Sequence, residues 1–252
     1  MIQKTKYIAV ASGKGGVGKS TLTLNLCNAL SKRYSMLSVD CDLGLANLDV
    51  LLGKTATYTL QDILCGLIQP QEACIEITPR FSLLPSASGT LESIGMDTMA
   101  VHLLFKKCVD FFNGFDCIFF DLGASITPIT LSFIQHATHT VVVITPEPAS
   151  LVDSYALIKV LATRSLVKDV YIVYSMVTEE QHAQELFNIL QTNIEQTLGD
   201  AIQIHYLGYV QYSLDVLHAV YNQHLLLDVV PHSVCVQNIE SISQHIERDI
   251  LH

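Results

Sequence analysis

The sequence predicts an α/β protein in which helices cover both faces of a mainly parallel sheet. Half of its 252 residues are apolar and only 15% are charged, as a sheet buried on both faces requires. Short runs rich in β-branched residues alternate with longer segments of helical periodicity, which is typical of βαβ units. The sequence contains no internal repeat and no linker rich in Pro, Gly or Ser. We therefore expect a single domain over residues 1–252.

Strand and helix candidates alternate along the chain. The strand candidates are Tyr7–Ala11, Met36–Asp40, Phe81–Leu84, Cys117–Asp121, Thr140–Thr145, Val170–Met176 and Ile204–Val210. The helix candidates are Lys19–Lys32, Thr98–Phe112, Pro128–Gln135, Ser150–Thr163, Glu180–Leu198, Ser213–Tyr221 and Pro231–Leu251. Right-handed crossovers place such helices on both faces of the sheet, and ligands bind beyond the carboxyl ends of the strands.

Composition and charge exclude several classes of function. The net charge is -10, from 24 acidic and 14 basic residues, so DNA is not an expected partner, because a non-specific DNA surface needs clustered Lys and Arg. The first residues lack a signal-peptide pattern, and no apolar run approaches the ~20 residues that span a bilayer. Seven scattered cysteines without C-x-x-C spacing indicate reduced thiols. We expect a cytoplasmic protein.

A glycine-rich segment lies between the first predicted strand and the first predicted helix. It fits the pattern G-x-x-x-x-G-K-[ST], which binds phosphates in this context. Glycines let successive backbone N–H groups point at phosphate oxygens, and the helix adds the positive end of its dipole. We expect Lys19 to bridge the β- and γ-phosphates and the Ser20 hydroxyl to bind Mg²⁺. The residues expected to contact the nucleotide here are Gly13, Lys14, Gly15, Gly16, Val17, Gly18, Lys19, Ser20 and Thr21.

Two acidic elements follow predicted strands. Asp40 ends the second predicted strand, and Asp42 lies two residues further along. Two carboxylates at this edge can hold a Mg²⁺-bound water and orient an attacking water. Asp121 ends the apolar strand before a turn of small residues, where an outer ligand of Mg²⁺ is expected. A lone Asp at a strand end usually caps a turn, so this interpretation depends on the phosphate loop.

Several motifs resemble a known family. The run K-G-G-V-G-K-S, with Lys14 early in the loop, resembles the deviant Walker A motif of the MinD/ParA group of ATPases. The runs V-D-C-D-L-G-L-A-N-L-D-V-L-L-G and P-E-P-A-S-L-V-D-S-Y-A-L-I-K-V-L are similar to the FlhG (FleN) branch of that group. The resemblance covers most of the chain. It implies a three-layer α/β/α P-loop NTPase of the SIMIBI class, with seven or eight strands in a mainly parallel sheet.

The resemblance also implies roles for individual residues. In that family the early lysine reaches across a dimer to the phosphates of the partner subunit, so Lys14 would act in trans and Lys19 in cis. Asp42 would orient the hydrolytic water. The residues implied at the metal site are Ser20, Asp40 and Asp121. The implied cofactors are ATP and Mg²⁺.

The implied function is a switch that forms an ATP-dependent homodimer and hydrolyses ATP slowly, with stimulation by a partner. In the FlhG branch such a switch controls flagellar number and placement. The implied partners are an FlhF-like GTPase and a flagellar transcription regulator.

The chain departs from the family pattern at both ends of the predicted site and at its last helix. Ser175, which we expect to contact the nucleotide, takes the place of an Asn that reads adenine, Gln211 replaces a usual Pro, and Ser125 replaces a usual Gly. The last helix carries more acidic than basic residues, so anionic lipid would repel it. We expect this helix to cover the core, and the sequence leaves peripheral contact with the inner face of the membrane open.

The sequence leaves three alternatives to the ATPase switch. The first is an adaptor that binds nucleotide with weak or no hydrolysis and acts through protein contacts. The second is an iron–sulfur relative, which would need cysteine spacings that this chain lacks. The third is a DNA-partitioning ATPase, which the acidic balance disfavours.

Overall fold

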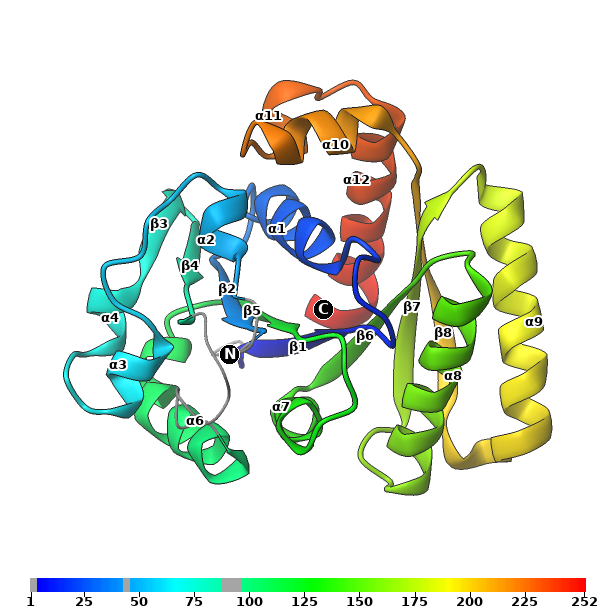
Figure 1. Cartoon of the computed structure of the whole chain (residues 1–252), viewed down its shortest axis with the longest axis horizontal. Coiled ribbons are helices and arrows are strands. Elements are labelled where there is room, and N and C mark those ends of the chain that lie inside the picture. The colour runs from blue at the N-terminus through cyan, green and yellow to red at the C-terminus, as the bar shows by residue number, and fades with distance from the viewer. Residues whose placement is uncertain (1–3, 43–45, 88–96) are drawn as a thin grey trace.

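One sheet of eight strands forms the centre of the computed structural model, which describes residues 4–42, 46–87 and 97–252 (Figure 1). The order across the sheet is β3-β4-β2-β5-β1-β6-β7-β8, and every neighbouring pair is parallel except β3 and β4. The strands are β1 (Lys6–Ala11), β2 (Met36–Cys41), β3 (Ile75–Thr78), β4 (Phe81–Leu84), β5 (Cys117–Leu122), β6 (His139–Ile144), β7 (Asp169–Val177) and β8 (Gln203–Gln211). The predicted mainly parallel sheet is confirmed.

All seven predicted strands are present, with ends that differ from the prediction by no more than one residue. The prediction missed β3, an edge strand of four residues that pairs antiparallel with β4. A run this short, partly exposed on an edge, carries too little period-2 pattern to be recognised.

Helices cover both faces of the sheet. They are α1 (Lys19–Leu30), α2 (Leu48–Leu51), α3 (Leu60–Leu64), α4 (Pro70–Ala73), α6 (Thr98–Phe112), α7 (Pro128–His136), α8 (Pro148–Thr163), α9 (Glu180–Leu198), α10 (Leu214–Tyr221), α11 (Leu226–Val229) and α12 (Val234–Ile246), with η1 (Gly199–Ala201) and η2 (Glu247–Leu251). Four short helices, α2, α3, α4 and α11, were not predicted, because four or five residues show no helical periodicity. The predicted helices are confirmed with small shifts at their ends. For example, α8 begins at Pro148 instead of Ser150, since proline suits the first turn.

The core has two halves that the strands separate. Along β1, Ala9 and Ala11 pack toward α6, α7 and α8, whereas Ile8 and Val10 pack toward α1 and α12. This alternation follows from the two-residue period of a strand. Figure 1 shows the same division, with α1, α10, α11 and α12 on one side of the sheet and α6, α7 and α8 on the other.

The last helix, α12, packs against β8 and α1. Its apolar stripe, which includes Ile239, Ile242 and Ile246, is buried, so the prediction that it covers the core is confirmed. The predicted start at Pro231 was three residues early, because Ser233 caps the helix by accepting from the Val236 amide. Two acidic side chains of this region pair with basic residues after α1, Glu240 with Lys32 and Glu247 with Arg33. Among the helices of the described ranges, none combines the length and apolar character needed to cross a membrane.

Close packing of β8 against α12 requires a glycine at position 208. Gly208 has φ 145, a conformation that L residues rarely adopt. A Cβ at this position would lie 2.7 Å from Cγ1 of Ile242. Both the backbone and the neighbouring helix therefore exclude a side chain.

We predict that Gly208→Ala lowers the free energy of unfolding by about 3 kcal/mol, the sum of backbone strain and overpacking. Gly66→Ala is the matched control, because Gly66 also has a positive φ of 74 but an added Cβ would meet only Nζ of Lys107, at 3.4 Å. We expect a loss of about 1 kcal/mol for the control. Urea denaturation of both variants checks the prediction, and equal losses would contradict it.

Candidate functional site

The glycine-rich loop lies between the end of β1 and the start of α1, as the sequence predicted. Gly16 and Gly18 have φ values of 78 and 83, and Gly18 is the N-cap residue of α1. The loop is held at its start by the Ser12 hydroxyl, which donates to the Lys14 carbonyl at 2.9 Å. The curled backbone at the positive end of a 12-residue helix is a ready-made phosphate site.

The first glycine of the loop touches helix α8. A Cβ on Gly13 would lie 2.3 Å from the carbonyl carbon of Asp153 and 2.5 Å from the amide nitrogen of Ser154. No side chain fits in that space, so the phosphate loop packs directly on the backbone of α8. A movement of α8 would therefore also displace the phosphate loop.

A buried polar network joins the loop to the end of β5. Lys19 Nζ donates to Asp121 Oδ1 at 2.8 Å, and the Ser20 hydroxyl donates to Asp121 Oδ2 at 2.6 Å. The Thr23 hydroxyl lies 3.3 Å from the same Oδ1. Lys19 is 6% exposed and Asp121 is fully buried. A buried carboxylate with several donors and an ammonium partner satisfies the usual condition for a buried charge.

Asp40 lies beside Asp121, because the two residues are register partners on β2 and β5. Both carboxylate oxygens of Asp40 accept backbone N–H groups, from Asp42 at 3.1 Å, Asn47 at 2.9 Å and Leu48 at 3.0 Å. Burial and the Asp121 carboxylate raise the pKa of Asp40 to about 7, although these N–H groups act in the opposite direction. Asp40 thus attaches the segment after β2 to the sheet.

Asp42 faces the turn that follows β5. Its Oδ1 lies 3.1 Å from the position that a Cβ on Gly123 would take, so the two acidic elements predicted from the sequence meet at this contact. Residues 43–45, which belong to the run similar to the FlhG branch, fall outside the described residues. Asp42 also lines the cavity beside the phosphate loop.

Lys14 forms an ion pair with Glu147, the residue that precedes α8. The side chains of Lys14 and Glu147 are 39% and 62% exposed, so the pair adds little to stability. The lysine expected to act in trans is therefore held by an acidic residue of its own chain, in a contact that can exchange for another partner at low cost. Sequence reasoning missed Glu147, which lies in a quoted motif but gave no sign of this contact.

A cavity of about 750 Å³ opens beside the phosphate loop. It is bounded by the loop, by Asp42 and by the turn after β5, including Ser125. Sequence reasoning missed its walls from the short helix α2 and from α10. The residues concerned are Asn47, Leu51, Val216, Leu217 and Val220. They are apolar or simple polar residues whose sequence carries no functional signal.

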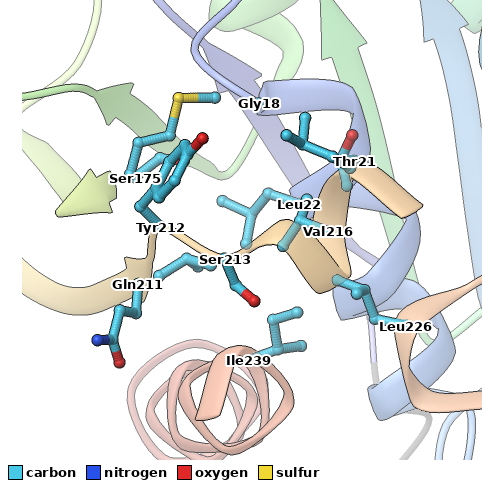
Figure 2. A pocket seen from close by; sticks show the side chains of 13 residues that line it. Gly18, Thr21, Leu22, Ser175, Gln211, Tyr212, Ser213, Val216, Leu226 and Ile239 are labelled. Atoms are coloured by element: carbon cyan, nitrogen blue, oxygen red, sulfur yellow. The ribbon is translucent and has the colours of Figure 1, made fainter. Parts of the chain in front are cut away.

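A smaller pocket of about 50 Å³ adjoins this cavity at the ends of β7 and β8, and Figure 2 shows it from close by. Ser175, predicted to contact the nucleotide, lines the pocket together with Met176. Met176 has φ 61 and is 40% exposed. Gln211 belongs to the lining, but its side chain points away from the other labelled residues in Figure 2.

The donors around the loop suit a magnesium nucleotide. Mg²⁺ prefers hard oxygen ligands and keeps few protein ligands beside waters and substrate phosphates. Ser20 and Asp121 supply a hydroxyl and a carboxylate within 2.6 Å of each other. Within the described part of the chain, no three His, Cys, Asp or Glu side chains gather as a metal centre. The residues present therefore fit Mg²⁺ bound together with phosphates.

A strand, a phosphate loop at a helix N-terminus and a buried Lys–Asp–Ser network define a P-loop nucleotide-binding protein. The chain matches the CobQ/CobB/MinD/ParA nucleotide binding domain over residues 8–226, and it belongs to that family. Members of the family are ATPases that bind ATP with Mg²⁺. The resemblance to the MinD/ParA group stated from the sequence is confirmed.

Relatives and solved structures agree with this family. The antiactivator FleN of Pseudomonas aeruginosa is 32% identical over 96% of this chain and 86% of its own. The flagellum site-determining protein YlxH of Helicobacter pylori is 30% identical over 95% of this chain and 81% of its own. The fold is similar to that of the cell division ATPase MinD of Pyrococcus furiosus, with a TM-score of 0.80 and 23% identity over 96% of this chain and 98% of that one. MinD of Pyrococcus horikoshii in complex with Mg-ADP gives a TM-score of 0.79 at 22% identity, over 98% and 99% of the two chains.

We predict that Asp40→Asn loosens the segment after β2. Asn keeps one acceptor oxygen but has an NH₂ group, which cannot accept, in place of the other. At least one of the backbone N–H groups of Asp42, Asn47 and Leu48 therefore loses its partner. The cost of an unsatisfied buried amide corresponds to exchange about tenfold faster or more. Native-state amide hydrogen exchange by NMR measures it, with Asp42→Asn as a control that keeps all three hydrogen bonds. Unchanged exchange at all three amides would contradict the prediction.

Proposed function

We propose that the chain, as a single domain over residues 1–252, is an ATP-binding and slowly hydrolysing switch that dimerises. The observation that carries the proposal is the network of Lys19, Ser20 and Asp121 at the base of an open phosphate loop. The network places the Lys19 ammonium, which can bind phosphate, and the Ser20 hydroxyl, which can bind Mg²⁺, at the N-terminus of α1.

The phosphate loop and its neighbours bind and orient the nucleotide. The backbone N–H groups of Gly13, Gly15, Gly16, Val17 and Gly18 surround the phosphates, with Thr21 at the start of α1. The Lys19 ammonium moves from Asp121 to the β- and γ-phosphates, because the phosphates compete with the Asp121 carboxylate for the same positive charge. When bound, Mg²⁺ would neutralise charge at the phosphates, and Ser20, Asp121 and Asp40 would hold it.

The hydrolytic step depends on Asp42 and on a second subunit. Asp42 lines the cavity beside the turn at Gly123, from which its carboxylate can orient an attacking water. Lys14 lies at the rim of the same cavity and is partly exposed. In a homodimer, Lys14 leaves Glu147 and neutralises charge on the phosphates of the partner subunit, as an arginine finger does. Hydrolysis is slow until a partner protein stabilises this arrangement.

The biological role that the relatives support is control of the number or placement of flagella, or a similar positioning task. One relative that matches most of this chain is named a flagellum site-determining protein, and another is named an antiactivator. We propose an FlhF-like GTPase and a flagellar transcription regulator as partners. We propose a cytoplasmic location, since Glu240 on α12 and Glu247 on η2 oppose docking on anionic lipid.

We predict that the chain dimerises with Mg·ATP and that Lys14→Ala abolishes dimerisation, because two sets of phosphates would then face each other without a neutralising cation. Lys32→Ala is the matched control, since Lys32 is an exposed lysine paired with Glu240 away from the cavity. Light scattering after size-exclusion chromatography should give the mass of two chains for the wild type and the control. A wild type that stays monomeric at saturating Mg·ATP would refute the dimer.

We predict that Asp42→Asn lowers phosphate release about 100-fold, because the amide cannot accept a proton or orient water as the carboxylate does. Binding of Mg·ATP should be retained, so dimers should accumulate. Asp49→Asn is the control, since the Asp49 side chain accepts from the Val50 amide and does not line the cavity. A coupled phosphate assay measures release. Binding without any release by the wild type would favour the non-hydrolysing adaptor.

A further inference from the structure

The smaller pocket lies where the base of a nucleotide would extend from the phosphate loop. Five of its lining residues also line the cavity around the loop: Gly18, Thr21, Met176, Val216 and Leu217. The pocket lies beyond the carboxyl ends of β7 and β8, between α1, α10 and α12 (Figure 2). A ligand whose phosphates sit at the N-terminus of α1 can therefore place a flat ring in this pocket.

The walls of this pocket are largely apolar. Aliphatic side chains come from α1, β8, α10, α11 and α12, and Tyr212 stands at the edge in Figure 2. The aliphatic lining residues are Leu22, Val210, Val216, Leu217, Leu226 and Ile239. Such walls favour any flat aromatic ring by contact and burial, and they do not distinguish one purine from another.

Three backbone donors at and after the end of β8 are already engaged. The Gln211 amide donates to Asn238 Oδ1 at 3.1 Å, and the Tyr212 amide donates to the Val177 carbonyl at 2.8 Å. The Asp215 amide donates to the Ser213 hydroxyl at 3.1 Å. The amide side chain of Gln211 points away from the pocket. These groups are therefore not available to read the edge of a base.

The polar side chains that remain in the described lining are the hydroxyls of Thr21, Ser175, Tyr212 and Ser213. A hydroxyl rotates to donate or to accept. Adenine presents a donor at the position where guanine presents an acceptor. A hydroxyl satisfies either base, whereas a fixed amide would satisfy one of them better.

We propose that this pocket is a purine site that does not discriminate between adenine and guanine, so that the chain binds Mg·GDP and Mg·GTP nearly as well as Mg·ADP and Mg·ATP. Ser175 is the residue that sets this breadth. The proposal rests on the proposed function, because it takes the phosphates to bind at the loop.

The pocket must widen from about 50 Å³ to admit a purine, and two side chains of its wall are exposed enough to change rotamer. Met176 is 40% exposed and Leu217 is 50% exposed. The unbranched thioether side chain of Met176 adapts to different ring shapes at small cost. A wall of this kind is typical of sites with broad ligand choice.

The test compares Mg·ADP with Mg·GDP by isothermal titration calorimetry of the whole chain. For the wild type we expect dissociation constants within about tenfold of each other. Ser175→Asn should raise the preference for Mg·ADP about tenfold or more, because an amide offers a fixed donor and acceptor to adenine. Ser165→Asn is the matched control, as Ser165 is exposed after α8 and has φ 50, which Asn tolerates.

The outcomes separate this inference from the proposed function. A wild-type preference for Mg·ADP above about 100-fold would overturn the inference and leave the switch intact. An unchanged ratio in a folded Ser175→Asn chain would overturn the assignment of Ser175. Failure of the wild type to bind either nucleotide would refute the proposed function and the inference together. The wild-type ratio decides the matter even where Ser175→Asn does not fold.

Discussion

The buried carboxylate of Asp121 is the interaction on which the rest of the site depends. Asp121 lies one residue before the end of β5, and its carboxylate accepts hydrogen bonds from Lys19, Ser20 and Thr23 in the first turns of α1. A carboxylate without exposure to water must keep charged or hydrogen-bonding partners, since leaving it unpaired would cost several kcal/mol. The helix start is therefore fixed against the sheet before any ligand arrives. The same requirement means that phosphates can take Lys19 only if another positive group, such as a bound metal, stays near Asp121.

Around this centre, several segments far apart in the sequence meet within contact distance. Gly13 lies against the backbone of α8, and Lys14 pairs with Glu147 at the start of that helix. Asp40 attaches the segment after β2 to the sheet. These contacts differ in strength. The Gly13 contact is a rigid steric constraint, whereas the exposed Lys14 pair can exchange cheaply. Such a combination holds the phosphate loop in place and leaves its outer lysine available to a partner.

Different interactions act at the two ends of the proposed nucleotide site. The phosphate end is built from charges, backbone dipoles and a buried ion pair, which give strong and specific attraction for a polyphosphate. The base end is a narrow apolar pocket whose nearby amides at Gln211 and Tyr212 are already paired within the fold. In the proposed nucleotide site, affinity would therefore come mainly from the phosphates. Burial of the ring adds to it without selecting strongly between rings of similar shape.

The sequence by itself determined the class of fold and the phosphate end of the site. The pattern from Gly13 to Ser20, with an apolar strand before it and a helix after it, is local, and local patterns survive folding because backbone geometry dictates them. Only the tertiary structure decided which distant groups share a site. It brought Glu147 to Lys14, turned both oxygens of Asp40 toward backbone amides, and built walls from α2 and α10. Those contacts depend on strand register and helix packing across the whole sheet, and no short stretch of residues encodes them.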